Sequence, residues 1–333
     1  MAGWRLHQQH LWWWALLTSK VRKYMFAKSV SRTLRSWLDR NYFDSMRYHI
    51  GAGVLANRRA HAPDFRDLWE AEVQVFSQWG EDGIIDFLFD CLAISKPKAL
   101  ELGVGNFKEC NTRFLAEHRG ASVVAVDARE DLPTFVRSLP AMWRTSIWPM
   151  VAWITPESAA AIQMAAREWM GGLDLISLDI DGNDYWVAQM LDFSDTALVV
   201  VEYNALFGQS SVTVPRNDSF DRREAHYSCL YFGASIRAWV DFFQARGFAL
   251  LGTNRVGSNA FFCNEALLTR VPLPRVDTDD LSPYVDWRVR ESRDVDGKLS
   301  FSHGEERVKA IQNLPVVHLS SDKVITVGEA VGA

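Results

Sequence analysis

The chain has 333 residues, 48% of them hydrophobic, which is enough to bury a large core in one or two domains. Its formal net charge is −5, but residues 1–60 carry +9 and the remainder carries −14. An acidic body argues against nucleic acid as a partner, because phosphate binding needs a basic surface. The four cysteines show no Cys-x-x-Cys or Cys/His spacing, which predicts a reducing, cytoplasmic location and no zinc site.

The N-terminal 65 residues are expected to form a basic, largely helical arm. The apolar run at 11–17 is too short to span a bilayer, and no small-x-small cleavage site follows it. From residue 20 to 38, apolar residues recur at helical spacing with lysines and arginines between them. Such a helix, preceded by three tryptophans, is typical of peripheral membrane contact through residues 1–40. The alternative is a helix that packs on the main domain and keeps its charges in water.

A loop at 51–65 is expected to lead into the main domain, residues 66–265. This domain opens with a predicted helix at 77–94, whose apolar residues form one stripe. Seven apolar runs then read as strands, at 98–102, 122–127, 146–151, 174–179, 197–202, 248–252 and 259–263. Helical patterns separate most of them, notably at 157–170 and 234–246.

Strands that alternate with helices indicate a mainly parallel sheet covered on both faces. The last two strands are joined by a short link and must be antiparallel, because parallel neighbours need a long crossover. A parallel sheet that ends in an antiparallel hairpin is typical of the Rossmann-like class I methyltransferase fold within the α/β class. Residues 266–333 are expected to form an irregular C-terminal extension with short β-like runs, LPVVHL and KVITV.

The stretch from 99 to 130 reads as a strand, a glycine turn, a helix and a second strand that ends in an acid. Gly103 and Gly105 allow a ligand to approach the backbone closely, and Asp127 can accept hydrogen bonds from ribose hydroxyls. This pattern predicts an adenosine-containing cofactor. The alternative is an ordinary strand–turn–helix whose glycine ends a structural element.

Two residues favour one cofactor over others. A dinucleotide fingerprint has a third glycine, but Lys108 occupies that position. Glu101, two residues before the first glycine, would repel a pyrophosphate and suits a cation. S-adenosylmethionine carries a sulfonium and an ammonium group, so we expect it as the cofactor. A nicotinamide-dependent oxidoreductase is a less favoured alternative.

Polar side chains also follow the strands at 174–179 and 197–202, namely Asp179, Asp181, Asn183, Asp184, Glu202 and Asn204. One interpretation is a general base that takes the proton of a substrate hydroxyl, with Asp181 and Glu202 as candidates. A second is a divalent cation held by these oxygens, although the EF-hand pattern is incomplete. A third is a turn with local caps. We favour the first, without a metal.

His226 is a further candidate base, because it lies in the loop between the strand at 197–202 and the next helix, on the expected ligand side of the sheet. A loop histidine can equally be structural. The loop at 205–225 and the tail beyond 266 are expected to shape the pocket for a methyl acceptor.

Five motifs resemble the FkbM-like family of S-adenosylmethionine-dependent methyltransferases: SQWGED at 77–82, ELGVGNFKECNT at 101–112, DLISLDIDGNDYW at 174–186, VEYN at 201–204 and HYSCLYFGAS at 226–235. The likeness covers roughly residues 70–265. It implies a class I methyltransferase fold and transfer of a methyl group to a small-molecule hydroxyl acceptor, on a sugar or secondary metabolite. The N-terminal arm departs from the family pattern.

The resemblance also implies roles for individual residues. Glu101, Gly103 and Gly105 would line the methionine end of the cofactor, with Asn106 in the same turn, and Asp127 would hold the ribose. Asp179 would face the reacting centre. Residues Gln78, Glu81 and Asp82 would cover the cofactor from the preceding segment. The alternative function is a catalytically silent protein of the same fold that acts by interaction or by membrane docking.

Overall fold

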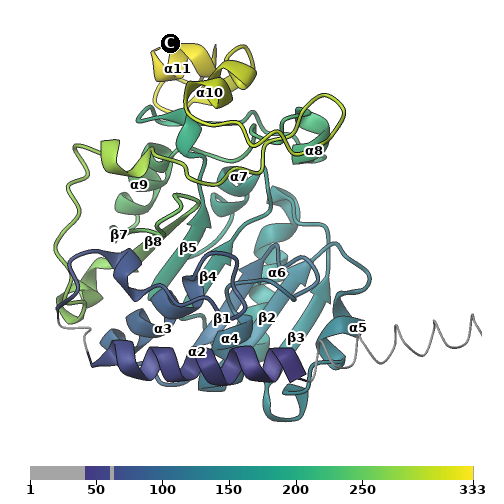
Figure 1. Ribbon diagram of the computed structural model, residues 1–333, viewed down its shortest axis with the longest axis vertical. Coiled ribbons are helices and arrows are strands. Elements are labelled where there is room, and N and C mark those ends of the chain that lie inside the picture. Colours follow the sequence, from purple (N-terminus) through teal and green to yellow (C-terminus); the bar gives the residue numbers. More distant parts are fainter. Residues whose placement is uncertain (1–41, 61–63, 333) are drawn as a thin grey trace, which may run out of the picture. The chain divides into compact units, whose positions relative to one another are not determined.

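The computed structural model describes residues 42–60 and 64–332 (Figure 1). The chain divides into two compact units, Met1–Ile50 and Gly51–Ala333, and the main sheet belongs to the second. The predicted amphipathic helix at 20–38 and its membrane contact lie outside the described residues. Within the described ranges, no helix combines the length and apolarity that crossing a membrane requires.

Residues 51–59 are not the expected loop but the second half of helix α2 (Asp44–Arg59). The two glycines there suggested a break in the helix. Gly51, however, packs against Val75 where a side chain would collide with it, and Leu55 is buried. Arg59 forms ion pairs with Asp86 at 2.9 Å and with Asp90, both on helix α3 (Glu81–Leu92). Tertiary contacts therefore offset the low helix propensity of glycine.

The main sheet has seven strands in the order β3-β2-β1-β4-β5-β8-β7. Strands β1 to β5 are parallel, and β8 runs antiparallel between β5 and β7. All seven predicted strands are confirmed: β1 (Lys98–Leu102), β2 (Ser122–Asp127), β3 (Ser146–Val151), β4 (Leu175–Leu178), β5 (Leu198–Glu202), β7 (Phe248–Thr253) and β8 (Asn259–Asn264). Pro149 is tolerated because β3 is an edge strand. This arrangement is the Rossmann-like class I methyltransferase fold.

Helices cover both faces of the sheet, and alternate residues of each strand point into one of two cores. One core contains Leu100 and Val124 with helices α6, α7 and α9, and the other contains Ala99 and Val123 with α3, α4 and α5. Between α2 and the tail, the α-helices are α3 (Glu81–Leu92), α4 (Arg113–Arg119), α5 (Leu132–Arg137), α6 (Pro156–Met170), α7 (Asp184–Ala188), α8 (Arg222–Ala225) and α9 (Ile236–Gln244). The 3₁₀-helices are η3 (Leu68–Ala71), η4 (Met142–Arg144), η5 (Ala205–Phe207), η6 (Glu265–Arg270) and η7 (Ser282–Tyr284).

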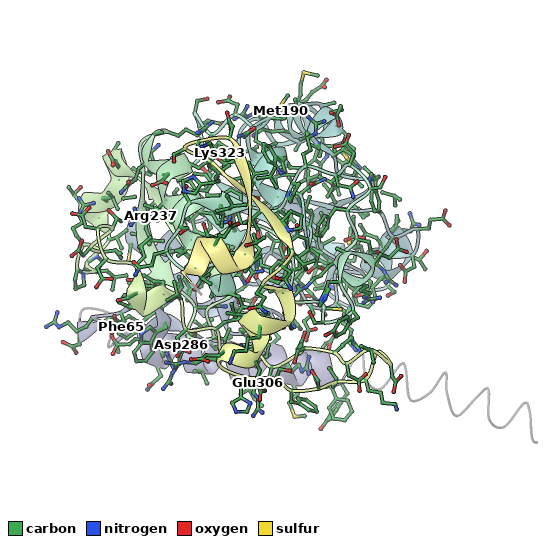
Figure 2. All side chains as sticks on the ribbon, turned by 90° about the horizontal axis from the view of Figure 1, so that it is seen from above. Phe65, Met190, Arg237, Asp286, Glu306 and Lys323 are labelled. Atoms are coloured by element: carbon green, nitrogen blue, oxygen red, sulfur yellow. The ribbon has the colours of Figure 1, made fainter. Side chains whose placement is uncertain are left out.

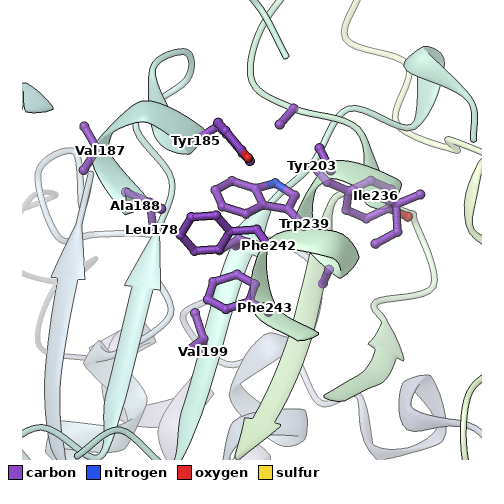
Figure 3. Packing of buried hydrophobic residues seen from close by; sticks show 14 of the residues in the cluster. Leu178, Tyr185, Val187, Ala188, Val199, Tyr203, Ile236, Trp239, Phe242 and Phe243 are labelled. Carbon is purple, nitrogen blue, oxygen red and sulfur yellow. The ribbon is translucent and has the colours of Figure 1, made fainter. Parts of the chain in front are cut away.

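Aromatic residues fill the first core between α7 and α9 (Figure 3). Tyr185 lies against Trp239 with ring centroids 5.6 Å apart, and Trp239 stacks on Phe243 at 5.7 Å. The Trp239 indole N–H donates to the carbonyl of Glu202 at 3.0 Å. This core therefore supports the carboxyl end of β5 from below.

The tail contains more regular structure than expected. Its two β-like runs are strands β9 (Pro315–His318) and β10 (Lys323–Thr326), which form a second sheet with β6 (Val212–Thr213), and helices α10 (Glu305–Ile311) and α11 (Val327–Val331) accompany them. Figure 2 shows the tail, with Glu306 and Lys323 labelled, in front of the rest of the domain when the molecule is seen from above. The hydroxyl of Tyr231 donates to the carbonyl of Pro315. The partner strand β6 is about a hundred residues away in sequence, so local patterns could not reveal this sheet.

Candidate functional site

A cavity of about 680 Å³ lies at the carboxyl ends of the parallel strands. This is the edge at which open α/β sheets bind ligands. The strand ends contribute Gly103 and Gly105 after β1, Asp127 at the end of β2, Trp153 after β3, Asp179 after β4 and Glu202 at the end of β5. Loops and the tail supply the remaining wall.

The two glycines of the turn are required for different reasons. Gly103 has φ +91°, and a Cβ there would lie 1.6 Å from the carbonyl oxygen of Asp179, so the backbones of β1 and β4 meet at this point. Gly105 has φ +55°, but a Cβ there would meet nothing within 4 Å. Gly103 therefore serves packing, whereas the absent side chain of Gly105 leaves cavity space open.

Asp127 is held rigidly beside this turn. One carboxylate oxygen accepts the Gly105 N–H at 2.7 Å and the other accepts the Arg129 N–H at 3.0 Å. Partial burial raises the pKa of Asp127. A carboxylate fixed at the end of β2 can accept hydrogen bonds from two neighbouring hydroxyl groups of a ligand.

Glu101 does not line the cavity. Its carboxylate is buried at the start of α4 and accepts the backbone N–H groups of Asn111 at 2.8 Å and Thr112 at 2.9 Å, together with the Thr112 hydroxyl. Burial raises the pKa of Glu101 to about 7. Asn106 is also outside the cavity wall, and its side chain accepts the Lys108 N–H at 3.1 Å. Glu101 thus holds the segment that leads into α4, and Asn106 makes a local hydrogen bond within the glycine turn.

Of the three acidic or amide residues at 78–82, only Gln78 lines the cavity. Glu81 is fully buried and accepts hydrogen bonds from the side chains of Asn254 at 2.7 Å and Asn259 at 2.9 Å. Asp82 is also buried, and one of its oxygens accepts three successive backbone N–H groups at residues 75–77. Burial raises the pKa of Asp82 to about 6. These two carboxylates therefore fold the segment that presents Gln78.

Asp179, Asp181 and Glu202 come together on the opposite side of the cavity, with carboxylate oxygens within 4.8 Å of one another. Burial raises the pKa of Asp179 and of Glu202 well above the ordinary range, and repulsion within the cluster raises both further. Two carboxyl groups this close do not ionise together readily. Asp181 is exposed and has φ +59°, an uncommon backbone conformation for a residue other than glycine.

In the rest of the Asp-Gly-Asn-Asp turn, Asp184 and Asn183 hold the backbone locally, and Asn183 also lines the cavity. The buried Asp184 accepts the backbone N–H groups of Ile180 and Gly182, both at 2.8 Å. Asn183 accepts the Asn217 N–H at 3.2 Å and so joins the turn to a neighbouring loop. After β5, the Asn204 side chain donates to backbone carbonyls of the 230–232 segment. Within this one motif, Asp184 stabilises the turn, whereas Asp179 and Asp181 line the cavity.

Arg222 is a site residue that the sequence reasoning missed. Its Nη1 lies 2.5 Å from Asp181 and 3.4 Å from Glu202, and its side chain is 18% exposed. The sequence indicated only that several clustered acidic residues require a nearby cation. It did not indicate that Arg222 supplies this cation, because α8 lies beside the ends of β4 and β5 only in the folded chain.

His226 ends α8 but is not part of the cavity wall. Its Nδ1 lies 2.7 Å from the Ser228 hydroxyl, its ring packs on Tyr227, and partial burial lowers its pKa. This side of the wall comes instead from residues 218–223, with Cys229, and from Glu291 and Arg293 of the tail.

No protein-family model and no curated protein matches this chain. Among solved structures, it is similar to a chain of a fibrillarin/Nop5p complex, with 14% identity over 60% of this chain and 88% of the other, at a TM-score of 0.31. It is also similar to a methyltransferase from Geobacter sulfurreducens, with 13% identity over 71% of this chain and 96% of the other, at a TM-score of 0.32. The resemblance to the FkbM-like family stays a prediction.

Proposed function

We propose that this protein is an S-adenosylmethionine-dependent methyltransferase that acts on a hydroxyl group of a small molecule, such as a sugar or secondary metabolite. One observation carries the proposal: the same cavity is lined by Gly105 and Asp127 on one side and by the Asp179–Glu202 pair on the other. The first two suit an adenosine, and the pair suits a proton transfer.

The composition of the cavity wall supports this cofactor over a dinucleotide. Seven carboxylate side chains line it against four arginines. An acidic wall favours a ligand with a sulfonium and an ammonium group and disfavours a pyrophosphate. Asp127 would hold the ribose hydroxyls, Trp153 offers an indole face beside the end of β3, and the space above Gly105 admits the ligand. The cofactor supplies an activated methyl group.

The chain's own residues would position the acceptor and take its proton. In its ionised form, either Asp179 or Glu202 can accept the proton of a hydroxyl group. Burial raises the pKa of both carboxyl groups, which makes either one a stronger base than an exposed carboxylate. Fixed walls on both sides would align the hydroxyl with the methyl group, and positioning of this kind supplies much of a transfer rate.

Calorimetry with S-adenosylmethionine, S-adenosylhomocysteine and NADH tests the cofactor assignment on the full-length protein. We expect micromolar binding of the first two and none of NADH. Asp127→Ala should weaken binding by about 10- to 100-fold, since it removes hydrogen bonds to a charged acceptor. Asp131→Ala is the matched control, because Asp131 is exposed and outside the cavity wall. Tighter binding of NADH, or no binding of either methyl-cycle ligand, would refute the proposal.

A further inference from the structure

We propose that the guanidinium group of Arg222 takes the place of a divalent metal ion among Asp179, Asp181 and Glu202, so that this cluster works with a cation built into the chain. The role of this cluster in methyl transfer rests on the proposed function. The presence of Arg222 in the cluster does not rest on it, and this presence can be tested without an activity assay.

The three carboxylates have the chemistry of a cation site. Their oxygens lie within 4.8 Å of one another, and an all-oxygen set is what Mg²⁺ and Ca²⁺ prefer. The Oε2 atom of Glu202 is buried and has no hydrogen-bond partner within the residues that the structure describes. Buried carboxylates of this kind are costly unless a positive charge compensates them.

Arg222 supplies that charge from inside the cluster. Its Nη1 lies 2.5 Å from Asp181 and 3.4 Å from Glu202, so one nitrogen bridges the ends of β4 and β5. It is also the cation whose charge opposes the rise in pKa of both Asp179 and Glu202. A small divalent ion needs several oxygens at about 2 to 2.5 Å, and it would have to displace this nitrogen to reach them.

The arginine is held by contacts that do not depend on the acids. Its Nε donates to the carbonyl of Cys229 at 2.7 Å, and its guanidinium lies 3.6 Å from the centre of the Phe232 ring. Asp221 caps α8, of which Arg222 is the first residue. The guanidinium is therefore fixed over the cluster in advance, which distinguishes it from an exposed arginine that adapts to nearby acids.

Binding of Mn²⁺, measured by electron paramagnetic resonance and calorimetry on full-length protein, tests this inference. The variant is Arg222→Met, which keeps an apolar stem on Phe232 and removes the charge. The matched control is Arg223→Met, because Arg223 lines the same cavity but, within the described residues, forms no ion pair with the cluster. We expect wild type and the control to bind Mn²⁺ weakly and Arg222→Met to bind it at least about tenfold more tightly. A second change, Asp181→Asn, should abolish that gain.

Tight stoichiometric binding of Mn²⁺ by wild type would overturn the inference, and so would a folded Arg222→Met variant with no gain in affinity. If Arg222→Met does not fold, thermal unfolding of wild type with EDTA or Mn²⁺ decides the question. No change in Tm supports the inference, whereas stabilisation by Mn²⁺ that Asp181→Asn removes contradicts it. Failure of wild type to bind S-adenosylmethionine would refute the proposed function alone, since the Mn²⁺ measurements do not depend on it.

Discussion

Replacing Gly105 by valine should separate cofactor binding from folding. The backbone at Gly105 has φ +55°, so any side chain there costs about 1 to 3 kcal/mol of stability. No atom lies within 4 Å of the position that a Cβ would take, so packing adds no further cost. For a domain of this size, such a loss lowers Tm by roughly 2 to 4 °C per kcal/mol.

The effect on binding should be much larger, because the valine side chain would project into the space proposed for the cofactor. We expect the affinity for S-adenosylhomocysteine to fall by at least about 100-fold, which corresponds to about 2.7 kcal/mol. Tm by differential scanning fluorimetry and Kd by calorimetry measure the two effects on the same samples.

Gly120 provides the control for backbone strain. It has φ +64°, nothing lies within 4 Å of its Cβ position, and it ends α4 outside the cavity wall. Gly120→Val should therefore lose similar stability and keep its affinity. Equal affinities of the two variants would refute the assignment of the Gly105 turn to the cofactor. Gly103→Ala should behave differently from both and fail to fold, since its Cβ would overlap the backbone of Asp179.

Three further predictions follow from the site and the arm. The Asp179→Asn variant should shift the rising limb of the plot of kcat/KM against pH to lower pH, because Glu202 loses the neighbouring charge that raises its pKa. If the limb does not move, the Asp179–Glu202 pair is not the base. Burial raises the pKa of Asp82 from 3.8 to about 6, so the folded state binds this proton more tightly than the unfolded state. The free energy of unfolding should therefore fall by up to about 3 kcal/mol as the pH rises from about 4 to 6. Urea unfolding across that range should show a flatter decline for Asp82→Asn, and an unchanged slope would contradict this. Deleting residues 1–40 should abolish binding to anionic liposomes in a flotation assay, whereas retained binding would place the membrane contact elsewhere.

The strands could be predicted because each is a short apolar run whose pattern is local. Even β3 was found despite Pro149, since an edge strand does not need that N–H. The helix across 51–59 was missed because its stability comes from Val75 and α3, which a local pattern does not contain. Long-range contacts decide secondary structure at such positions.

The same reason limited prediction of the site. Asp127, Asp179 and Glu202 could be placed at one sheet edge, because they end parallel strands. The distinction between Asp181, which faces the cavity, and Asp184, which folds the turn, depends on hydrogen bonds that the residue pattern does not show. The position of Arg222 depends on a loop that returns from β5 to β4.

The two sides of the cavity come from different parts of the chain. The turn after β1 and the ends of β2 and β3 build one side, whereas residues 218–229 and the tail wall the other. The N–H of Arg293 in the tail donates to the carbonyl of Ser228 at 3.1 Å, next to the residue that holds Arg222. Under the proposed function, substitutions in the tail should therefore alter acceptor choice during evolution, or in a designed chimera, and leave the side proposed for the methyl donor unchanged.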